Sequence, residues 1–162
     1  MTLCHGWRPI MRGLGGLVLS LLLQGPVMAV AADNDNNAVH CLALNLYWEA
    51  RSEGEEGMIA VGWVVLNRMA HPKYPATACE VIHQGGVEPP CQWSWWCDGR
   101  SDKPTEPKAW AQAQTLAKRL LQDPPSDPTY GAIWFHHERL EPPSWLNKRE
   151  SVAYIGKHIF YK

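Results

Sequence analysis

Hydrophobic residues recur at helical spacing in three stretches between residues 36 and 122. Apolar positions three and four residues apart share one face of a helix, so each stretch predicts an amphipathic helix. Asn36 or Asn37 can cap the first predicted helix. One face of this helix carries Cys41, Leu44 or Asn45, and Trp48.

The second predicted helix follows a break at Arg51–Gly54 and begins at about Glu55. Asn67-Arg68 closes it ahead of His71-Pro72, because a residue before proline is pushed out of the helical region. Its apolar stripe consists of Met58, Val61, Val65 and Met69.

The third helix has the clearest boundaries. Thr105 is its predicted cap, with Glu106 and Pro107 in the first turn, and Asp123-Pro124-Pro125 stops it. Basic residues near its end suit the negative end of the helix dipole. The apolar stripe is formed by Trp110, Ala113, Ala117 and Leu120.

The remaining segments are short or irregular. Residues 74–77 are predicted to form a loop before a helical turn at Cys79–His83, and residues 85–102 are rich in Gly, Pro and Trp. Residues 131–137 alternate in the manner of a short strand. The pattern as a whole predicts a small, mostly helical α+β fold with one short β element.

Residues 1–31 have the features of a signal peptide. Arg8 and Arg12 precede an apolar run over residues 13–23, and alanines at 29, 31 and 32 offer a cleavage site. A retained membrane anchor is the alternative, but the apolar run is short for a span and Gly25-Pro26 follows it. We therefore expect export to the periplasm or cell envelope, with no stable membrane insertion after cleavage.

Residues 32–162 are then expected to form one catalytic domain, large enough for a single core. Without Arg8 and Arg12, thirteen basic residues stand against sixteen acidic ones, a formal charge of about −3. This balance disfavours nucleic acid and anionic membrane surfaces as partners. Eight tryptophans remain, at least half of which are expected to fill the core while others contact ligands.

Four cysteines follow the predicted leader: Cys41, Cys79, Cys91 and Cys97. In an exported protein, four cysteines suggest two disulfides with three possible connectivities, and the proximity of Cys91 and Cys97 favours Cys91–Cys97 with Cys41–Cys79. The alternative is a zinc site using Cys91, Cys97, His136 and His137. Its Cys-x5-Cys spacing is wider than structural zinc sites use, so no metal or other cofactor is expected.

Glu49 lies among aromatic and aliphatic residues in the first predicted helix. Burial there disfavours the ionised form and raises the pKa of the carboxyl, which is the property that a general acid needs. The ordinary alternative is a glutamate that is solvated or paired.

Several distinctive blocks follow one another over about residues 38–162. They are Tyr47-Trp48-Glu49-Ala50-Arg51-Ser52-Glu53, Val64-Val65-Leu66-Asn67-Arg68, Tyr74-Pro75-Ala76-Thr77, Cys91-Gln92-Trp93-Ser94 with Asp98-Gly99, Asp127-Pro128-Thr129-Tyr130-Gly131-Ala132, Pro143-Ser144-Trp145, and Ile155-Gly156-Lys157-His158-Ile159-Phe160-Tyr161. In this order they resemble the SleB/CwlJ-type cell wall hydrolases, the spore cortex-lytic enzymes and their relatives.

The resemblance implies a small domain similar to lysozyme and the lytic transglycosylases, acting on peptidoglycan glycan strands without a cofactor. Glu49 matches the family's catalytic glutamate. The chain departs from the family at Ser52, where glycine is usual, and at Trp93, where phenylalanine is usual. It also lacks the separate peptidoglycan-binding repeats of the cortex enzymes, so a preference for muramic lactam is not implied.

Other residues of these blocks have expected roles around Glu49. Arg51 and Glu53 are expected to support the site, with Arg51 paired to Glu53 or Asp98. A second carboxylate, if the enzyme uses one, would be Glu53 or Asp98. The residues expected to contact substrate are Gln92, Ser94, Asp98, Tyr130 and His136. Asn67 and Arg68 are expected to close their helix, and His158 to be a buried hydrogen-bonding residue.

Three functions therefore remain open on the sequence. The first is a glycan-cleaving enzyme that cuts the muramic acid–glucosamine bond through Glu49, as a lytic transglycosylase. The second is a zinc-dependent N-acetylmuramoyl-L-alanine amidase, which needs metal ligands and an activated water. The third is a peptidoglycan-binding domain without catalytic activity.

Overall fold

The structure is a computed structural model in which residues 27–162 are described, with side chains from residue 34 onward. Its helices and strands follow the chain in the order α1 (Val27–Ala50), α2 (Gly54–Ala70), α3 (Ala78–Ile82), η1 (Ser94–Trp96), α4 (Pro107–Gln122), β1 (Trp134–His137), η2 (Ser144–Lys148), β2 (Ser151–Ile155) and β3 (His158–Tyr161). Both η elements are 3₁₀ turns.

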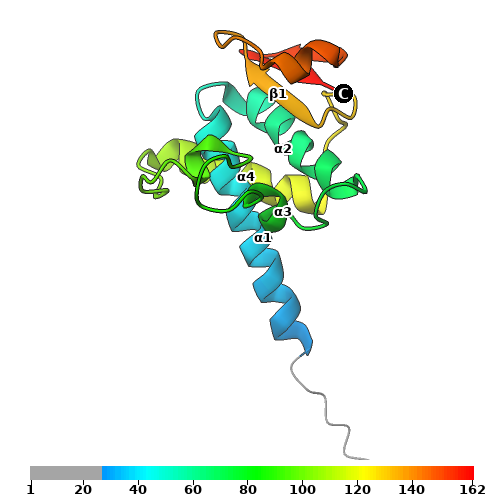
Figure 1. Ribbon diagram of the computed structural model, residues 1–162. Coiled ribbons are helices and arrows are strands. Elements are labelled where there is room, and N and C mark those ends of the chain that lie inside the picture. The colour runs from blue at the N-terminus through cyan, green and yellow to red at the C-terminus, as the bar shows by residue number, and fades with distance from the viewer. Residues whose placement is uncertain (1–26) are drawn as a thin grey trace, which may run out of the picture.

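Helix α1 is the centre of the helical part. It contacts α2, α3 and α4, and its N-terminal end projects from the body of the molecule (Figure 1). Leu42 and Leu46 share one face, Tyr47 lies on another, and all three are fully buried. A helix that is apolar all round is one that neighbours surround. The sequence predicted one apolar face for this helix, whereas in the structure more than one face is buried.

The predicted cap of α1 is wrong. The helix begins at Val27 rather than at Asn36 or Asn37. The segment between these positions contains three alanines, the residue with the highest helix propensity, so the helix does not stop at the asparagines. The predicted leader falls mainly on residues outside the described part and stays a prediction.

Helices α2 and α4 lie close to their predicted positions. The start of α2 at Gly54 differs by one residue from the prediction, and its end at Ala70 lies two residues beyond Arg68. The residue that precedes α4 is Glu106 rather than Thr105, with Pro107 as the first helical residue. Thr105 is instead drawn into a contact with α1, described below.

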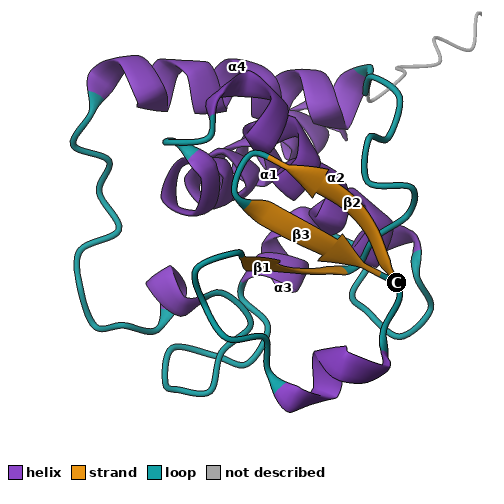
Figure 2. Cartoon of the chain, turned by 90° about the horizontal axis from the view of Figure 1, so that it is seen from above, coloured by secondary structure: helices purple, strands orange, loops and turns teal. Residues whose placement is uncertain are grey.

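The three strands form one antiparallel sheet in the order β1-β3-β2 (Figure 2). Phe135 of β1 pairs with Phe160 of β3, and Phe160 is fully buried. The sequence pattern predicted β1 but not the β2–β3 hairpin. The turn of this hairpin contains Gly156 at φ +58°, a left-handed conformation that glycine adopts without the steric cost of a side chain.

Two disulfides join the cysteines in the favoured connectivity. Cys41–Cys79 links α1 to α3, with Cα atoms 5.3 Å apart. Cys91–Cys97 closes the irregular segment around η1, with Cα atoms 6.2 Å apart. The second bridge therefore shapes the loop that carries Gln92, Trp93 and Ser94.

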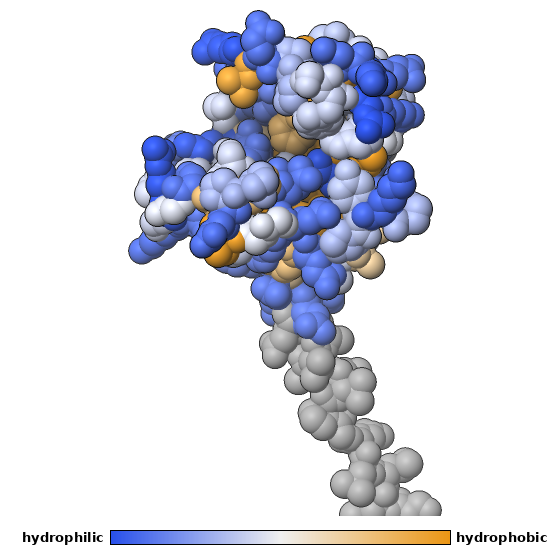
Figure 3. All heavy atoms as spheres, viewed as in Figure 1, coloured by the Kyte–Doolittle hydropathy of each residue, from blue (hydrophilic) through white to orange (hydrophobic). Residues whose placement is uncertain are grey.

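The fold is the mostly helical α+β fold with a small β element that the sequence predicts. Within the described residues, no helix combines the length and apolar character needed to cross a membrane. The face shown in Figure 3 is largely hydrophilic, with hydrophobic residues in small patches. The core instead holds the apolar side chains, and six of the eight described tryptophans lie in it or pack against it: Trp48, Trp63, Trp93, Trp95, Trp96 and Trp110.

Candidate active site

A cleft of about 430 Å³ lies between the end of α1, the η1 segment and the sheet. Glu49 and Arg68 come from the C-terminal ends of α1 and α2, and His158 comes from β3. The other lining residues come from the segment around η1, from β1 and from the segment between β1 and β2. They are Cys91, Gln92, Trp93, Ser94, Trp134, Phe135, His136, His137, Leu140, Glu141, Pro143 and Trp145. Segments far apart in sequence thus converge on one carboxyl group.

Glu49 is half-buried, with part of its carboxyl reaching the cleft. Removal of water raises its pKa from 4.5 to about 7, while the positive charge of Arg68 acts in the opposite direction. Desolvation disfavours the carboxylate, and the cation limits the effect. A substantial fraction of Glu49 therefore carries a proton at neutral pH. This is the environment that the sequence predicted for it.

The position of Glu49 depends on the turn that ends α1. The backbone N–H of Glu53 donates to the carbonyl of Ala50 at 3.0 Å, and Gly54, the first residue of α2, takes φ +71°. Only glycine adopts this left-handed conformation without strain. The chain therefore reverses directly after Glu49, which leaves this residue at the exposed end of a buried helix.

Arg68 is a buried cation, whereas the sequence pattern indicated only a residue that closes α2. Its side chain is 2% exposed, and its Nε donates to the carbonyl of Ile133 at 2.8 Å. The guanidinium lies 5.0 Å from the Trp93 ring and 5.3 Å from the Tyr74 ring. Burial lowers its pKa to about 10, so it remains charged at neutral pH. Arg68 thus supplies a fixed positive charge beside the cleft.

Gln92 connects Arg68 to the cleft wall. With its amide oxygen turned toward the guanidinium, Gln92 accepts hydrogen bonds from both terminal nitrogens of Arg68, at 3.1 and 3.2 Å. This orientation satisfies both partners and leaves the Gln92 amide nitrogen to donate elsewhere. Ser94 lies on the same wall and is exposed. Both residues therefore line the cleft, and their contact with substrate stays a prediction.

Two histidines, His136 and His158, line the cleft. Their Nδ1 atoms are enclosed and lack a hydrogen-bond partner within the described structure. His158 is 4% exposed, so it is buried as the sequence predicts, although its ring borders the cleft. Burial is the main cause that lowers the pKa of each ring, so both are neutral at neutral pH. The two rings therefore add no charge to the cleft.

Aromatic rings form much of the cleft wall. Trp93 is nearly fully buried, Trp134 is half-buried, and Trp145 is 51% exposed at the outer edge. Trp134 and Trp145 meet edge to face with ring centroids 6.2 Å apart. Flat apolar rings beside a few polar groups are typical of a carbohydrate-binding groove. The presence of Trp93 instead of the family's usual phenylalanine keeps this aromatic character.

Glu53 does not line the cleft. Its side chain is 5% exposed, and its Oε2 accepts a hydrogen bond from the backbone N–H of Lys157 at 2.9 Å. The Ser52 hydroxyl donates to Oε1 at 3.1 Å. Burial would raise the pKa of Glu53, but these hydrogen bonds and Lys157 together lower it. Glu53 is therefore an ionised link from the α1–α2 turn to the β2–β3 hairpin, consistent with a supporting role.

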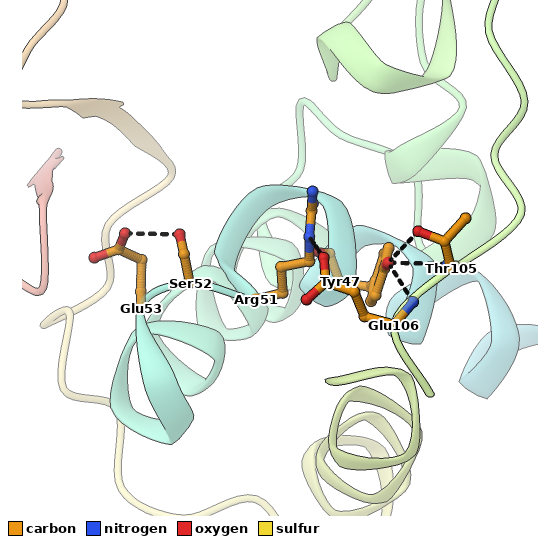
Figure 4. Close-up of polar contacts among 6 residues, drawn as sticks. All are labelled: Tyr47, Arg51, Ser52, Glu53, Thr105 and Glu106. Carbon is orange, nitrogen blue, oxygen red and sulfur yellow. Dashed lines mark hydrogen bonds and ion pairs between the residues drawn. The ribbon is translucent and has the colours of Figure 1, made fainter. Parts of the chain in front are cut away.

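Arg51 has a different partner from the two that were expected. Its Nε donates to Oε1 of Glu106 at 2.8 Å, and neither Glu53 nor Asp98 pairs with it. The hydroxyl of Tyr47 accepts from the backbone N–H groups of Thr105 and Glu106, at 3.0 and 3.1 Å. Figure 4 shows Glu53 on the other side of the turn from these contacts. Arg51 therefore holds the start of α4 against α1, away from the cleft.

Asp98 and Tyr130 lie outside the cleft lining. Asp98 is exposed, and its Oδ1 accepts from the backbone N–H of Arg100 at 2.8 Å, so it caps its own turn. Tyr130 is 67% exposed at φ +52°. Asp127 fixes that turn by accepting from the N–H groups of Thr129 and Gly131. The Asp127–Ala132 block is therefore a structural turn, which a sequence pattern alone does not separate from a binding loop.

Glu141 is the second carboxylate of the cleft lining, and no motif in the sequence singled it out. It is exposed in the segment before η2. The prolines that follow Glu141 interrupt any periodic pattern, so the sequence does not predict that this side chain faces the cleft. The cleft thus combines one partly desolvated carboxyl with one in contact with water.

The ligands of the alternative zinc site are not available as a set. Cys91 and Cys97 are joined to each other, so neither offers the thiolate that zinc binds. Across the described residues, no group of three or more His, Cys, Asp or Glu side chains has the arrangement of a metal site. This geometry argues against the zinc site considered from the sequence.

A second hollow, of about 510 Å³, lies at the other end of α1. It is lined by residues of α1, α3 and the end of α4, among them Asn34, Asp35 and Gln122. Its acidic residue is exposed on the surface of α1. Although this hollow is larger, it offers no desolvated acid, so we place the candidate active site at Glu49.

The chain resembles known spore proteins over most of its length. It is 28% identical over 139 residues to the spore cortex-lytic enzyme of Oceanobacillus iheyensis, covering 85% of this chain and 46% of that protein. It is 29% identical over 127 residues to the corresponding enzyme of Bacillus subtilis, covering 77% of this chain and 37% of that protein. The chain thus spans less than half the length of these relatives.

This chain matches solved structures of isolated catalytic domains over nearly their whole length. The catalytic domain of the Bacillus cereus SleB protein aligns with a TM-score of 0.60 at 29% identity, covering 78% of this chain and 91% of that one. The catalytic domain of the germination-specific lytic transglycosylase SleB from Bacillus anthracis aligns with a TM-score of 0.62 at 29% identity, covering 78% and 94%. The match therefore covers nearly the whole of each catalytic domain.

Residues 52–161 match the family described as Cell Wall Hydrolase, a range that begins just after Glu49 and includes every strand and every helix after α1. The fold, the order of the blocks and the matched range agree with the resemblance seen in the sequence. The chain belongs to the Cell Wall Hydrolase family.

Proposed function

We propose that this protein cleaves the glycan strands of peptidoglycan, at the bond between muramic acid and glucosamine, as a lytic transglycosylase with Glu49 as its one catalytic residue. The observation that carries the proposal is a carboxyl group with a pKa of about 7 inside an aromatic cleft. The similarity to catalytic domains of SleB proteins supports it. The site of action is the cell envelope, after export by the leader at residues 1–31.

In the first step, Glu49 acts as a general acid. The glycosidic oxygen is a poor leaving group, so it must receive a proton as the bond from the muramic acid C1 breaks. Glu49 transfers its proton to this oxygen, which leaves as the hydroxyl of the next sugar. Positive charge then develops at C1 and the ring oxygen, and the carboxylate left on Glu49 faces that charge.

In the second step, Glu49 acts as a base. The C6 hydroxyl of the same muramic acid attacks C1, and its proton passes to the Glu49 carboxylate. A 1,6-anhydro ring forms, and Glu49 regains the proton it gave away. One carboxyl group suffices because the nucleophile belongs to the substrate. The need for only one catalytic carboxyl group agrees with the cleft, because the other lining carboxylate, Glu141, is exposed to water.

Neutral polar groups around Glu49 fit an uncharged sugar. His136 and His158 add neutral rings to the cleft wall, and Gln92 offers its amide nitrogen once the oxygen faces Arg68. Sugar hydroxyls and an N-acetyl group supply matching donors and acceptors. Trp134 and Trp145 provide apolar surface for the faces of the rings.

Digestion of purified sacculi followed by mass spectrometry of the products tests the proposal. A lytic transglycosylase yields muropeptides ending in 1,6-anhydromuramic acid, whereas a hydrolase yields reducing ends that are heavier by one water. An amidase instead releases free peptides and leaves the strands intact. Reducing ends, or free peptides whose release a chelator abolishes, would overturn the proposal. Binding of glycan strands without any cleavage would indicate a peptidoglycan-binding domain that has no catalytic activity.

A further inference from the structure

A neighbouring hollow of about 440 Å³ borders the cleft at Glu49. Gln92 and Trp134 line both spaces, so the two hollows share a wall. The remaining residues of the neighbouring hollow are His71, Lys73, Tyr74, Gln84, Ile133 and Arg149. A branch of a ligand bound at Glu49 would reach this hollow by passing over Trp134.

The neighbouring hollow is positively charged, in contrast to the main cleft. Lys73 and Arg149 are both exposed at its edge, and no acidic residue is among its described lining residues. The salt bridges found in the described structure use other cations. Lys148 extends the positive surface, because it lines a further hollow together with Arg149 and Trp145. Cations at such a rim attract carboxylates.

Arg149 is held in a defined place. Its guanidinium lies 4.0 Å from the centre of the Trp134 ring, a cation–π contact on the wall between the two hollows. The strand-forming residues of β1 fix Trp134 in turn, because Trp134 pairs with Tyr161 of β3. This contact ties the exposed Arg149 to the sheet beside the cleft.

We propose that this hollow, with Lys73 and Arg149, binds the carboxylates of the peptide stem attached to the muramic acid. The proposal rests on the proposed function, since it concerns the same substrate strand. Peptidoglycan stems branch from the lactyl group of muramic acid and carry free carboxylates. An uncharged sugar in the main cleft and an anionic branch in the neighbouring hollow match the charges of the two spaces. The enzyme then prefers strands that carry peptides.

Two glycan substrates test this inference. One is a set of uncrosslinked strands that keep their peptide stems. The other is the same set after an amidase has removed the stems and the lactyl carboxylates that this exposes have been converted to neutral amides. The double variant Lys73→Glu/Arg149→Glu is compared with Lys108→Glu/Lys118→Glu, which makes the same charge change on exposed positions of α4. We expect kcat/KM on stem-bearing strands to fall roughly tenfold in the first variant and to stay unchanged in the control.

Cleavage of stem-free strands should be the same in all forms, and the difference on stem-bearing strands should shrink as salt screens the charges. The single variant Lys73→Glu leaves the Trp134 contact intact and should show a smaller loss of the same kind. Equal losses on both substrates, or no loss on stem-bearing strands, would overturn the inference.

Binding separates this inference from the proposed function. If the wild type cuts neither substrate, the proposed function fails, but affinities for the two sets of strands still decide the inference. Tighter binding of stem-bearing strands, lost in Lys73→Glu/Arg149→Glu and kept in the control, supports it. Equal binding of both sets by the wild type contradicts it.

Discussion

At the scale of single residues, two opposing influences set the proton affinity of Glu49. Desolvation raises its pKa, and the buried guanidinium of Arg68 holds it at about 7. A general acid works best when its pKa lies close to the working pH. Arg68 therefore tunes the acid without an ion pair to it within the described structure, and the cation is fixed by Ile133 and Gln92.

The activity should fall on the alkaline side of neutrality. Glu49 must begin the reaction protonated, and its proton is lost as the pH rises through about 7. The histidines in the cleft have lowered pKa values, so they are already neutral there. The pH dependence of kcat/KM on sacculi should show this limb. A rate that stays flat across this alkaline range would contradict the assignment.

Replacing Glu49 with Gln should stabilise the protein at alkaline pH. The raised pKa means that the folded state binds more protons than the unfolded state between about pH 4.5 and pH 7, so stability falls as pH rises across this window. Glutamine carries no charge to desolvate. We expect a gain of roughly 1–3 kcal/mol at mildly alkaline pH, less than the full shift implies because Glu49 is partly exposed.

Urea unfolding of wild type and Glu49→Gln, at a mildly alkaline pH and at an acidic pH below 4.5, measures this gain. The two proteins should differ little at the acidic pH, where the wild-type carboxyl is largely protonated in both states. A variant less stable than wild type at the alkaline pH would show that the folded protein favours the Glu49 carboxylate, which contradicts desolvation as the dominant influence on its pKa.

The residue scale also shows what a sequence can predict. The raised pKa of Glu49 could be predicted from its aromatic and aliphatic neighbours, whereas its catalytic role was implied by the family resemblance and stays a prediction. The burial of Arg68 could not be predicted, because a basic residue near a helix end is common and its burial depends on Trp93 and Tyr74 from other segments. The exposed Asp98 and Tyr130 belong to turns, which share their residue types with binding loops.

At the scale of elements, Glu53 couples the α1–α2 turn to the β2–β3 hairpin. Glu53→Gln weakens a charge-assisted hydrogen bond to the Lys157 N–H, which should cost roughly 1–3 kcal/mol at neutral pH. The pKa of Glu53 is lower in the folded state than in the unfolded state. Its contribution to folding stability is therefore present above its unfolded-state pKa and is lost as the pH falls through its folded-state pKa.

Thermal unfolding of Glu53→Gln at neutral pH and at strongly acidic pH checks this role. The loss should be clear at neutral pH and nearly absent once the wild-type carboxyl is protonated. Gly156→Ala serves as a companion, because a Cβ there would lie 2.7 Å from Glu53 Oε2 in a left-handed turn. It should destabilise the same contact without changing a charge. A stable Gly156→Ala protein would argue that the hairpin does not depend on this approach.

The two disulfides should differ in what they support. The 41–79 bridge closes a loop of 38 residues, so Cys41→Ala/Cys79→Ala should lower stability by about 4 kcal/mol in the chain-entropy model. The 91–97 bridge closes only six, which gives about 2 kcal/mol. The shorter bridge, however, shapes the segment that carries Gln92 and Trp93.

Paired measurements of unfolding free energy and activity separate these roles. Cys91→Ala/Cys97→Ala should lose more activity on sacculi than Cys41→Ala/Cys79→Ala does at a temperature where both are folded. The reverse order would show that the η1 segment is positioned by other contacts.

The helices were predictable as elements because their apolar periodicity extends over many residues, while their ends depend on local contacts. Thr105 has the chemistry of a cap, yet Tyr47 of α1 occupies its backbone N–H. The β2–β3 hairpin was not predicted, because its strands are only five and four residues long and give too short a pattern of alternating polar and apolar residues. Tertiary packing decides such segments.

At the scale of the whole molecule, the leader remains a prediction. All the described side chains that line the cleft lie within residues 34–162, so a chain that begins at Asp33 should fold and act as the full chain does. N-terminal sequencing of the exported protein should start at Ala32 or Asp33. A mature protein that begins at Met1 would mean that the segment is kept.

The central claim is that Glu49 alone performs the acid and base steps, and one comparison tests it most directly. Initial rates of anhydro-muropeptide release from sacculi are measured for wild type, Glu49→Gln and Glu141→Gln, with folding checked by circular dichroism. Glu49→Gln keeps the shape of the side chain but not its transferable proton, so its rate should fall by roughly a hundredfold or more. Glu141→Gln should remain near the wild-type rate. Near-normal activity of Glu49→Gln, or equal losses in both variants, would contradict the claim.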